Sequence, residues 1–197
     1  EAGLQPLADA LYADPTLTPL AEAAKFINTA PSADGAAVAF ADAQACLDGA
    51  RDILSEQWAE DASLVGKLRE WLWSNGRFSS KLAAGKDGTN PDAAKFKDYF
   101  DYEEPIARVP SHRALAVLRG RAQEWLDARL ALDEEVTPGR PTLAEGRIAA
   151  HLGWRHAQRP GDELMRRTIA WTWKVKLALS LERDLFARLR ECAEAVA

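Results

Sequence analysis

Hydrophobic positions along this chain recur mostly at spacings of three and four, which is the period of an amphipathic helix. One such stripe runs from Val38 to Trp58 and predicts a helix of about six turns. Asp61 is a suitable N-cap for a following helix, which ends at the Asn75-Gly76 pair. After Pro160, two neighbouring apolar stripes share one long helical region, so we expect that region to be buried between neighbours.

Two segments depart from this helical period. Residues 77–82 could form a short strand, whereas residues 125–132 fit a strand or a helix equally well. If both are strands, they could pair into a small ribbon on a helical body. The sequence therefore predicts an all-α fold, a multi-helix domain with at most one small two-stranded β ribbon.

The loop over residues 133–141 contains Pro138, Gly139 and Pro141, which predicts a subdomain boundary there. We expect residues 1–137 to form a helical region with the possible ribbon. Residues 138–197 are expected to form a second helical region that continues into the rest of a longer protein. The chain starts at Glu1 without Met and stops inside a predicted helix, which also suggests a piece of something longer.

Composition supports a globular chain with a large core, since 47% of the residues are hydrophobic and 28% are charged. We expect Trp58, Trp171 and at least one of Trp71 and Trp73 to be largely buried, because they lie on apolar stripes. The longest apolar stretches are far below the roughly 18 residues that a membrane span needs. No secretory signal is visible either, so we expect a cytoplasmic protein without a membrane partner.

Charge is distributed unevenly along the chain, whose formal net charge is -5. Residues 1–65 carry a net charge of -9, residues 66–121 carry +4, and residues 122–197 are neutral overall. An isolated nucleic-acid-binding module usually has a clear basic excess, because phosphate neutralisation supplies most of its affinity. Only the middle third meets this criterion, and only weakly.

Signatures of catalysis, metal binding and cofactor binding are missing. The sequence contains no GxGxxG, GxxxxGK[ST], GxSxG or HExxH motif. Cys46 and Cys192 lie 146 positions apart, and the five-residue spacing of His151 and His156 does not align two ligands on one helical face. We therefore expect no catalytic residues, no metal site, no cofactor and no enzymatic activity.

The segment from Lys95 to Arg121 is the most distinctive, because aromatic residues alternate there with basic ones. Such a segment could stack bases and hold the phosphates of a single strand. In the alternative interpretation Phe96, Tyr99 and Phe100 anchor the segment in the core, and their helical spacing favours this interpretation.

Ser111 is a good N-cap for a helix that runs through Arg119 and stops at Gly120. His112 and Arg113 would then lie in the first turn, where backbone amides and a cation could meet a phosphate. The candidate nucleic-acid-binding residues lie in the basic middle third of the chain and share a positive charge: Lys81, Lys86, Lys95, Lys97, Arg108, Arg113, Arg119 and Arg121.

Several ordered blocks of this sequence resemble the Tex family of bacterial transcription accessory proteins. The blocks are KFKDYFDY (95–102), PSHRALAVLRGR (110–121), ARDILSEQWAEDASLVGKLREWLW (50–73), RIAAHLG (147–153) and TWKVKLALSLERDL (172–185). The likeness spans nearly the whole chain but departs after Arg121, where Ala122-Gln123-Glu124 replaces the usual Asn-Glu-Gly. The resemblance implies the helical N-terminal half of such a protein, ahead of RNase H-like, helix-hairpin-helix and OB-fold RNA-binding domains.

Two functional hypotheses follow. The resemblance implies a scaffold and interaction region of a transcription-associated nucleic-acid-binding protein. The alternative is a direct nucleic-acid-binding helical module that uses the basic middle third. The expected partners are RNA or DNA through the full-length protein and other domains of the same chain, with the transcription machinery as a further candidate.

Overall fold

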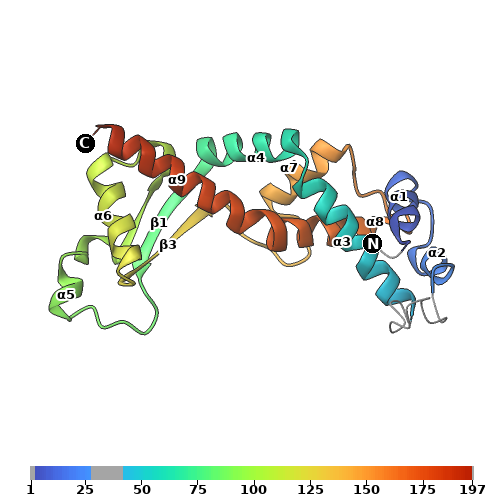
Figure 1. Cartoon of the computed structure of the whole chain (residues 1–197), viewed down its shortest axis with the longest axis horizontal. Helices are drawn as coiled ribbons and strands as arrows, with labels where there is room; N and C mark the ends of the chain where they lie inside the picture. The colour runs from blue at the N-terminus through green and yellow to red at the C-terminus, as the bar shows by residue number, and fades with distance from the viewer. Residues whose placement is uncertain (1–2, 28–41, 197) are drawn as a thin grey trace. The chain divides into compact units, whose positions relative to one another are not determined.

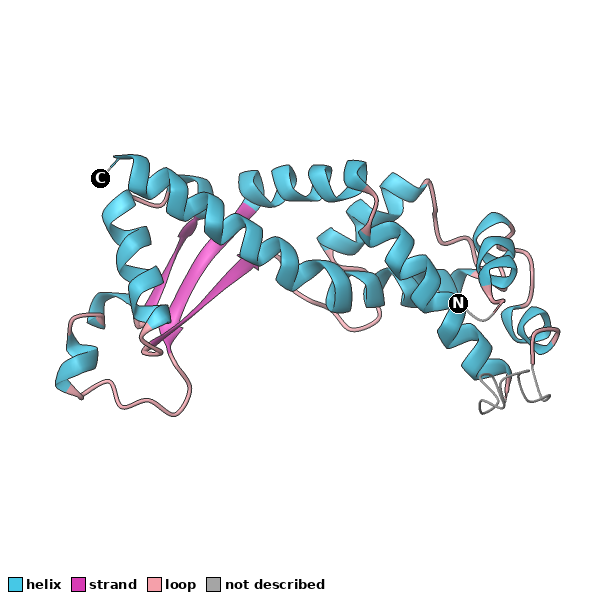
Figure 2. Ribbon diagram, in the orientation of Figure 1, coloured by secondary structure: helices cyan, strands magenta, loops and turns pink. Residues whose placement is uncertain are grey.

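The computed structural model describes residues 3–27 and 42–196 (Figure 1). Along the chain its elements are α1 (Gln5–Ala13), α2 (Pro19–Ala24), α3 (Ala43–Ala59), α4 (Ala62–Asn75), β1 (Gly76–Leu82), α5 (Pro91–Ala94), η1 (Lys97–Tyr99), β2 (Asp101–Pro105), η2 (Ile106–Arg108), α6 (Ser111–Ala122), β3 (Leu126–Leu132), α7 (Leu143–Leu152), α8 (Asp162–Trp171), the π-helical segment η3 (Thr172–Leu177) and α9 (Ala178–Val196). The predicted, mainly helical fold is confirmed (Figure 2). The predicted limit of a two-stranded ribbon is wrong, because three strands form an antiparallel sheet in the order β2-β1-β3.

The chain divides into two compact units. A helical unit comprises residues 1–65 and 137–177, and a sheet unit comprises residues 66–136 and 178–197. The helical unit contains α1, α2, α3, α7, α8 and η3, whereas the sheet unit contains the three strands with α5, α6 and α9. In the described parts of the chain, no helix combines the length and the apolar character that a membrane crossing requires.

Helix α3 is the centre of the helical unit, and α1, α2, α8 and η3 pack against it. The side chain of its N-cap residue Asp42 accepts a hydrogen bond from the backbone N–H of Ala45 at 2.8 Å. Trp58 lies on the buried face, so the predicted apolar stripe is the face that packs inward. The first predicted positions, Val38 to residue 41, lie outside the described residues, and the described helix begins at Ala43.

Helix α7 has strong signals at both ends. Thr142 and Glu145 form a reciprocal capping box at its start, and Gly153 ends it in the left-handed conformation with φ of 69°. The predicted helix over residues 143–152 is therefore confirmed. The long helical region expected after Pro160 is also present, as α8, η3 and α9 in succession.

Tryptophan burial departs from the prediction. Trp58 is buried as expected. Trp171 and at least one of Trp71 and Trp73 were expected to be largely buried as well, but all three are half-buried. Arginine side chains cover two of these rings. The guanidinium of Arg51 lies 3.7 Å from the Trp171 ring centroid, and that of Arg188 lies 4.3 Å from the Trp73 ring centroid.

The sheet unit is built around β1, the central strand. Side chains at Phe78 and Ser80 point to the covered face, where the Phe78 ring meets Phe186 of α9 edge-on at 5.2 Å. Helix α6 packs on both β3 and α9. At the outer edge of β3, the backbone N–H of Leu130 donates a hydrogen bond to the Glu182 carboxylate of α9 at 3.0 Å. This contact satisfies one of the backbone groups that an edge strand leaves unpaired.

Both predicted limits of α6 are wrong. Strand β2, which precedes it, was not predicted from the sequence. Pro110 occupies the cap position in an extended conformation, so Ser111 is the first helical residue and caps nothing with its side chain. Gly120 does not stop the helix, which continues to Ala122. A Cβ atom at Gly120 would lie 2.4 Å from Leu126 Cδ1, so glycine allows close packing of α6 on β3.

Candidate functional site

The uncovered face of the sheet carries balanced charges. Side chains of directly paired residues in an antiparallel sheet share one face. The register pairs Lys81 of β1 with Asp101 of β2 on one side and with Asp127 of β3 on the other. On the same face, Arg77 Nε lies 3.1 Å from Glu103 Oε1. Lys81 is thus flanked by two carboxylates, which oppose the approach of a phosphate.

Arg113, in the first turn of α6, is engaged with β2. Its Nη1 donates to Glu104 Oε1 at 2.6 Å, and its guanidinium lies 5.9 Å from the centroid of the Tyr102 ring. Burial, followed by the neighbouring Glu104 carboxylate, raises the pKa of Tyr102 to about 12. The cation expected to meet a phosphate at this helix start therefore has an internal carboxylate partner.

Three other candidates lie over aromatic rings. Lys86 Nζ is 5.3 Å from the Trp125 centroid, and the Arg121 guanidinium is 5.2 Å from the Phe186 centroid. Lys95 Nζ lies 5.3 Å from the ring of its neighbour Phe96. These contacts cover ring surface with cations and leave the charges at the solvent boundary.

The remaining candidates are Lys97 of η1, Arg108 of η2 and Arg119 of α6. All three are exposed, and none forms an ion pair within the part of the chain that the structure describes. The eight predicted residues therefore come from β1, the β1–α5 loop, the end of α5, η1, η2 and α6. Their contact with nucleic acid stays a prediction.

Of the four aromatic residues in the 95–121 segment, Phe96 is buried and the other three are half-buried. Phe96 is 2% exposed, and its ring borders Gly120 of α6. Tyr99 and Phe100 are only half-buried, so the expected anchoring holds fully for Phe96 alone. Tyr99 meets Tyr102 edge-on with centroids 5.4 Å apart. Rings engaged in this way offer little free surface for stacking on bases.

Tyr102 supplies a test of this packing. Its raised pKa means that the folded state keeps the phenol protonated, so the sheet unit loses stability as pH rises from about 10 toward 12. We expect an absorbance titration of the folded chain to show one tyrosine that ionises at about pH 12. That late step should vanish in Tyr102→Phe, whereas its persistence in this variant would contradict the assignment.

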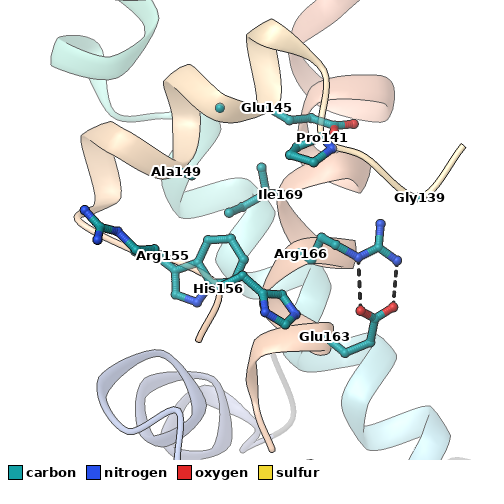
Figure 3. A pocket seen from close by; sticks show the side chains of 11 residues that line it. Gly139, Pro141, Glu145, Ala149, Arg155, His156, Glu163, Arg166 and Ile169 are labelled. Atoms are coloured by element: carbon teal, nitrogen blue, oxygen red, sulfur yellow. Dashed lines mark hydrogen bonds and ion pairs between the residues drawn. The ribbon is translucent and has the colours of Figure 1, made fainter. Parts of the chain in front are cut away.

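A pocket in the helical unit was not anticipated. It lies between α7 and α8 and has a volume of about 440 Å³ (Figure 3). Its lining consists of Gly139, Pro141, Glu145, Gly146, Ala149, Trp154, Arg155, His156, Glu163, Arg166 and Ile169. In Figure 3 Glu163 and Arg166 face one another, and Arg155 lies on the other side of the pocket. Two hydrogen bonds of 2.6 and 3.0 Å join that pair, and they lower the pKa of Glu163 to about 2.

Asp162 fixes the loop beside this pocket. Its carboxylate is 0% exposed and accepts hydrogen bonds from Trp154 Nε1 at 2.9 Å and from the backbone N–H groups of Ala157 and Arg159 at 2.8 and 3.0 Å. The Arg159 guanidinium adds two more contacts of 3.0 Å. Although burial opposes ionisation, these donors hold the Asp162 pKa well below its usual range. The Pro160-Gly161-Asp162 run was the available sequence signal, since an acidic residue favours a helix start.

The described residues contain no candidate metal-binding cluster and no disulfide. No group of three or more His, Cys, Asp or Glu side chains there could hold a metal ion. Cys46 is buried, which raises its thiol pKa, and Cys192 is exposed; both are free. The described geometry thus consists of a basic surface, on which Arg113 is ion-paired and Lys81 is flanked by carboxylates, and a separate apolar pocket with charged residues at its rim.

Comparison with known proteins decides the family. The family model described as "Tex central region-like" matches residues 14–197. The chain belongs to the Tex family. This Tex-family chain is 43% identical over 195 residues to Protein YhgF of Escherichia coli and 44% identical over 202 residues to Protein tex of Bordetella pertussis. It is 40% identical over 194 residues to the Transcriptional accessory protein Tex of Neisseria gonorrhoeae.

These alignments cover 98 to 100% of the Tex-family chain but only 24% of each relative. The chain therefore spans about a quarter of the length of the curated relatives that it matches. The resemblance inferred from the sequence blocks is confirmed.

Proposed function

We propose that this chain is a scaffold and interaction region of a transcription-associated nucleic-acid-binding protein of the Tex type, without catalytic activity of its own. The names of two relatives support the association with transcription, since one is called a transcriptional accessory protein and another is Protein tex. In this proposal RNA or DNA is bound by the full-length cytoplasmic protein, and this region holds other domains or partner proteins.

The observation that supports a scaffold most directly is the internal use of the 95–121 segment. Phe96 packs under α6, Tyr102 lies beneath Arg113, and the Arg113 guanidinium is held by Glu104. A surface built to bind a single strand instead presents stacking aromatics and unpaired cations along one groove. The side chains of this segment thus contribute to folding more than to an open binding track.

The alternative, direct nucleic-acid binding, draws support from Lys97, Arg108 and Arg119. These exposed cations have no ion-pair partner among the described residues, and each could contact a phosphate. Three contacts release few counterions, so binding that rests on them is weak and has a shallow salt dependence, with a slope of log K against log salt of about -2 to -3. The net charge of -5 opposes it further.

The distinguishing experiment measures binding of labelled single-stranded RNA and duplex DNA to this chain and to the full-length protein. We expect binding by the full-length protein and, at physiological salt, weak or undetectable binding by the 197-residue chain. Binding by the chain that equals the full-length protein in affinity would favour the direct-binding alternative.

A further inference from the structure

We propose that the pocket between α7 and α8 receives an apolar side chain from an acidic peptide segment of a partner protein. This inference rests on the proposed interaction role and names the chemistry of the partner. The pocket volume of about 440 Å³ lies within the range of specific ligand sites.

The pocket walls are suited to an apolar anchor. Pro141, Ala149, Ile169 and the Trp154 ring supply apolar surface to the pocket. Gly146 leaves open space on the exposed side of α7, because a Cβ atom placed there would have no heavy atom within 4 Å. An inserted side chain can therefore approach the helix backbone closely and lose its contact with water.

The charged groups at the rim sum to one excess positive charge, because Arg155, Arg166 and Arg167 outnumber Glu145 and Glu163. Glu163 is neutralised by Arg166 and also contacts Arg167 at 3.1 Å, while Glu145 accepts the backbone N–H of Thr142 at 3.0 Å. Within the described residues, Arg155 forms no ion pair and is exposed beside the pocket. Residues 137–177 as a whole contain eight Arg and Lys against three Asp and Glu, a net charge of +5. Carboxylates that flank the anchor would complement this field.

The site is held in place before any partner arrives. Asp162 ties the Trp154 indole, the Ala157 amide and Arg159 to the start of α8, so the loop that carries Arg155 has little freedom to lose on binding. A preorganised site binds a short segment with a smaller entropic cost than a loop that must first become ordered.

A peptide fits these features better than a nucleic acid. The Trp154 indole is the large aromatic ring of the pocket, and it is hydrogen-bonded to Asp162 and packs against His156 in a T-shaped arrangement, with centroids 6.0 Å apart. A nucleobase needs a free aromatic face for stacking and several cations along its backbone.

Selection from a random library tests the proposal although the partner is unidentified. Phage-displayed random peptides of about twelve residues are selected on the chain and counter-selected on Gly146→Leu, which fills the pocket. We expect clones that bind the parent but not this variant, each with a Leu, Ile or aromatic residue flanked by Asp or Glu. A library that yields no pocket-dependent clone, or yields basic ones, overturns the proposal.

Synthetic versions of the selected peptides then give the affinities by fluorescence anisotropy. Gly146→Leu should weaken binding about tenfold or more, and Arg155→Glu about fivefold, with the second effect reduced at high salt. Gly66→Leu is the matched control, because Gly66 lies in α4 and its Cβ would also meet nothing within 4 Å. Arg183→Glu, an exposed position on α9, controls for charge reversal.

Both controls should bind within about twofold of the parent. Equal binding by the parent and Gly146→Leu overturns the pocket as the site. A single-stranded oligonucleotide that displaces the peptide, and that itself fails to bind Gly146→Leu, overturns the peptide as occupant. Strong RNA binding elsewhere on the chain would refute the scaffold function but leave these peptide results unchanged, so the two failures are distinguishable.

Discussion

Asp162→Ala is expected to lower the free energy of unfolding of the helical unit by about 3 kcal/mol or more. The substitution removes the acceptor for Trp154 Nε1 and for the amides of Ala157 and Arg159, and it leaves the Arg159 guanidinium without its carboxylate. Each buried donor left unsatisfied adds a cost of about 1 to 3 kcal/mol. Urea unfolding followed by tryptophan fluorescence measures the loss.

Glu163→Gln is the control for this prediction. Glu163 is the neighbouring residue and also contacts an arginine, but its side chain is 50% exposed, so its loss should cost less than about 1 kcal/mol. Equal effects of the two substitutions would show that Asp162 does not organise the loop.

The pH dependence of the Asp162 effect has a definite sign. Because the folded state lowers the Asp162 pKa, ionised Asp162 stabilises the fold fully above its ordinary pKa of about 4, and this contribution declines as pH falls further. The stability difference between the parent and Asp162→Asn should therefore narrow below about pH 4. A difference that stays constant from about pH 7 to about pH 2.5 would contradict the buried, ionised carboxylate.

Phe96→Ala is expected to destabilise the sheet unit by about 3 to 5 kcal/mol. The ring is 2% exposed and borders Gly120, so its removal leaves a cavity next to α6. Phe100→Ala should cost clearly less, because that ring is half-buried against the loop at Gly88. Thermal unfolding monitored by circular dichroism compares the two variants with the parent.

Arg121→Ala is the control for the two phenylalanine variants, because it removes an exposed side chain of the same segment. Arg121 is exposed and covers one face of Phe186, so its loss should cost no more than about 1 kcal/mol. If Phe96→Ala unfolds at the temperature of the parent while the full-length protein loses RNA binding, the segment contacts nucleic acid and does not organise the fold.

Local sequence signals predicted those elements whose hydrogen bonds and hydrophobic pattern are contained within one short segment of the chain. The helix over 143–152 carries both of its end signals, and the change of period after Gly76 indicated a possible strand at β1. For β3 the pattern over residues 125–132 fitted a strand and a helix equally well, so periodicity did not decide. Strand β2 was missed because its five residues, DYEEP, are mostly polar and lie at a sheet edge. Only pairing with a strand some 25 residues earlier defines it, and no local pattern reports such a pairing.

For the candidate site residues too, local features could be predicted from the sequence and tertiary contacts could not. The positive charges of Lys81 and Arg113 are visible in the sequence, but the carboxylates beside them depend on strand register and on the contact between α6 and β2. Asp162 and the pocket were missed because they arise from packing of α8 and its preceding loop against α7. Tertiary contacts of this kind leave little trace in composition or periodicity.

The most direct test of the scaffold function replaces Lys95, Lys97, Arg108 and Arg119 together by Glu in the full-length protein. Binding of labelled single-stranded RNA is then measured as a function of salt concentration. The account predicts that affinity changes by less than about threefold and that the slope of log K against log salt stays as in the parent. A slope reduced by about one for each replaced residue, with a matching loss of affinity, would show that this surface binds the phosphates itself.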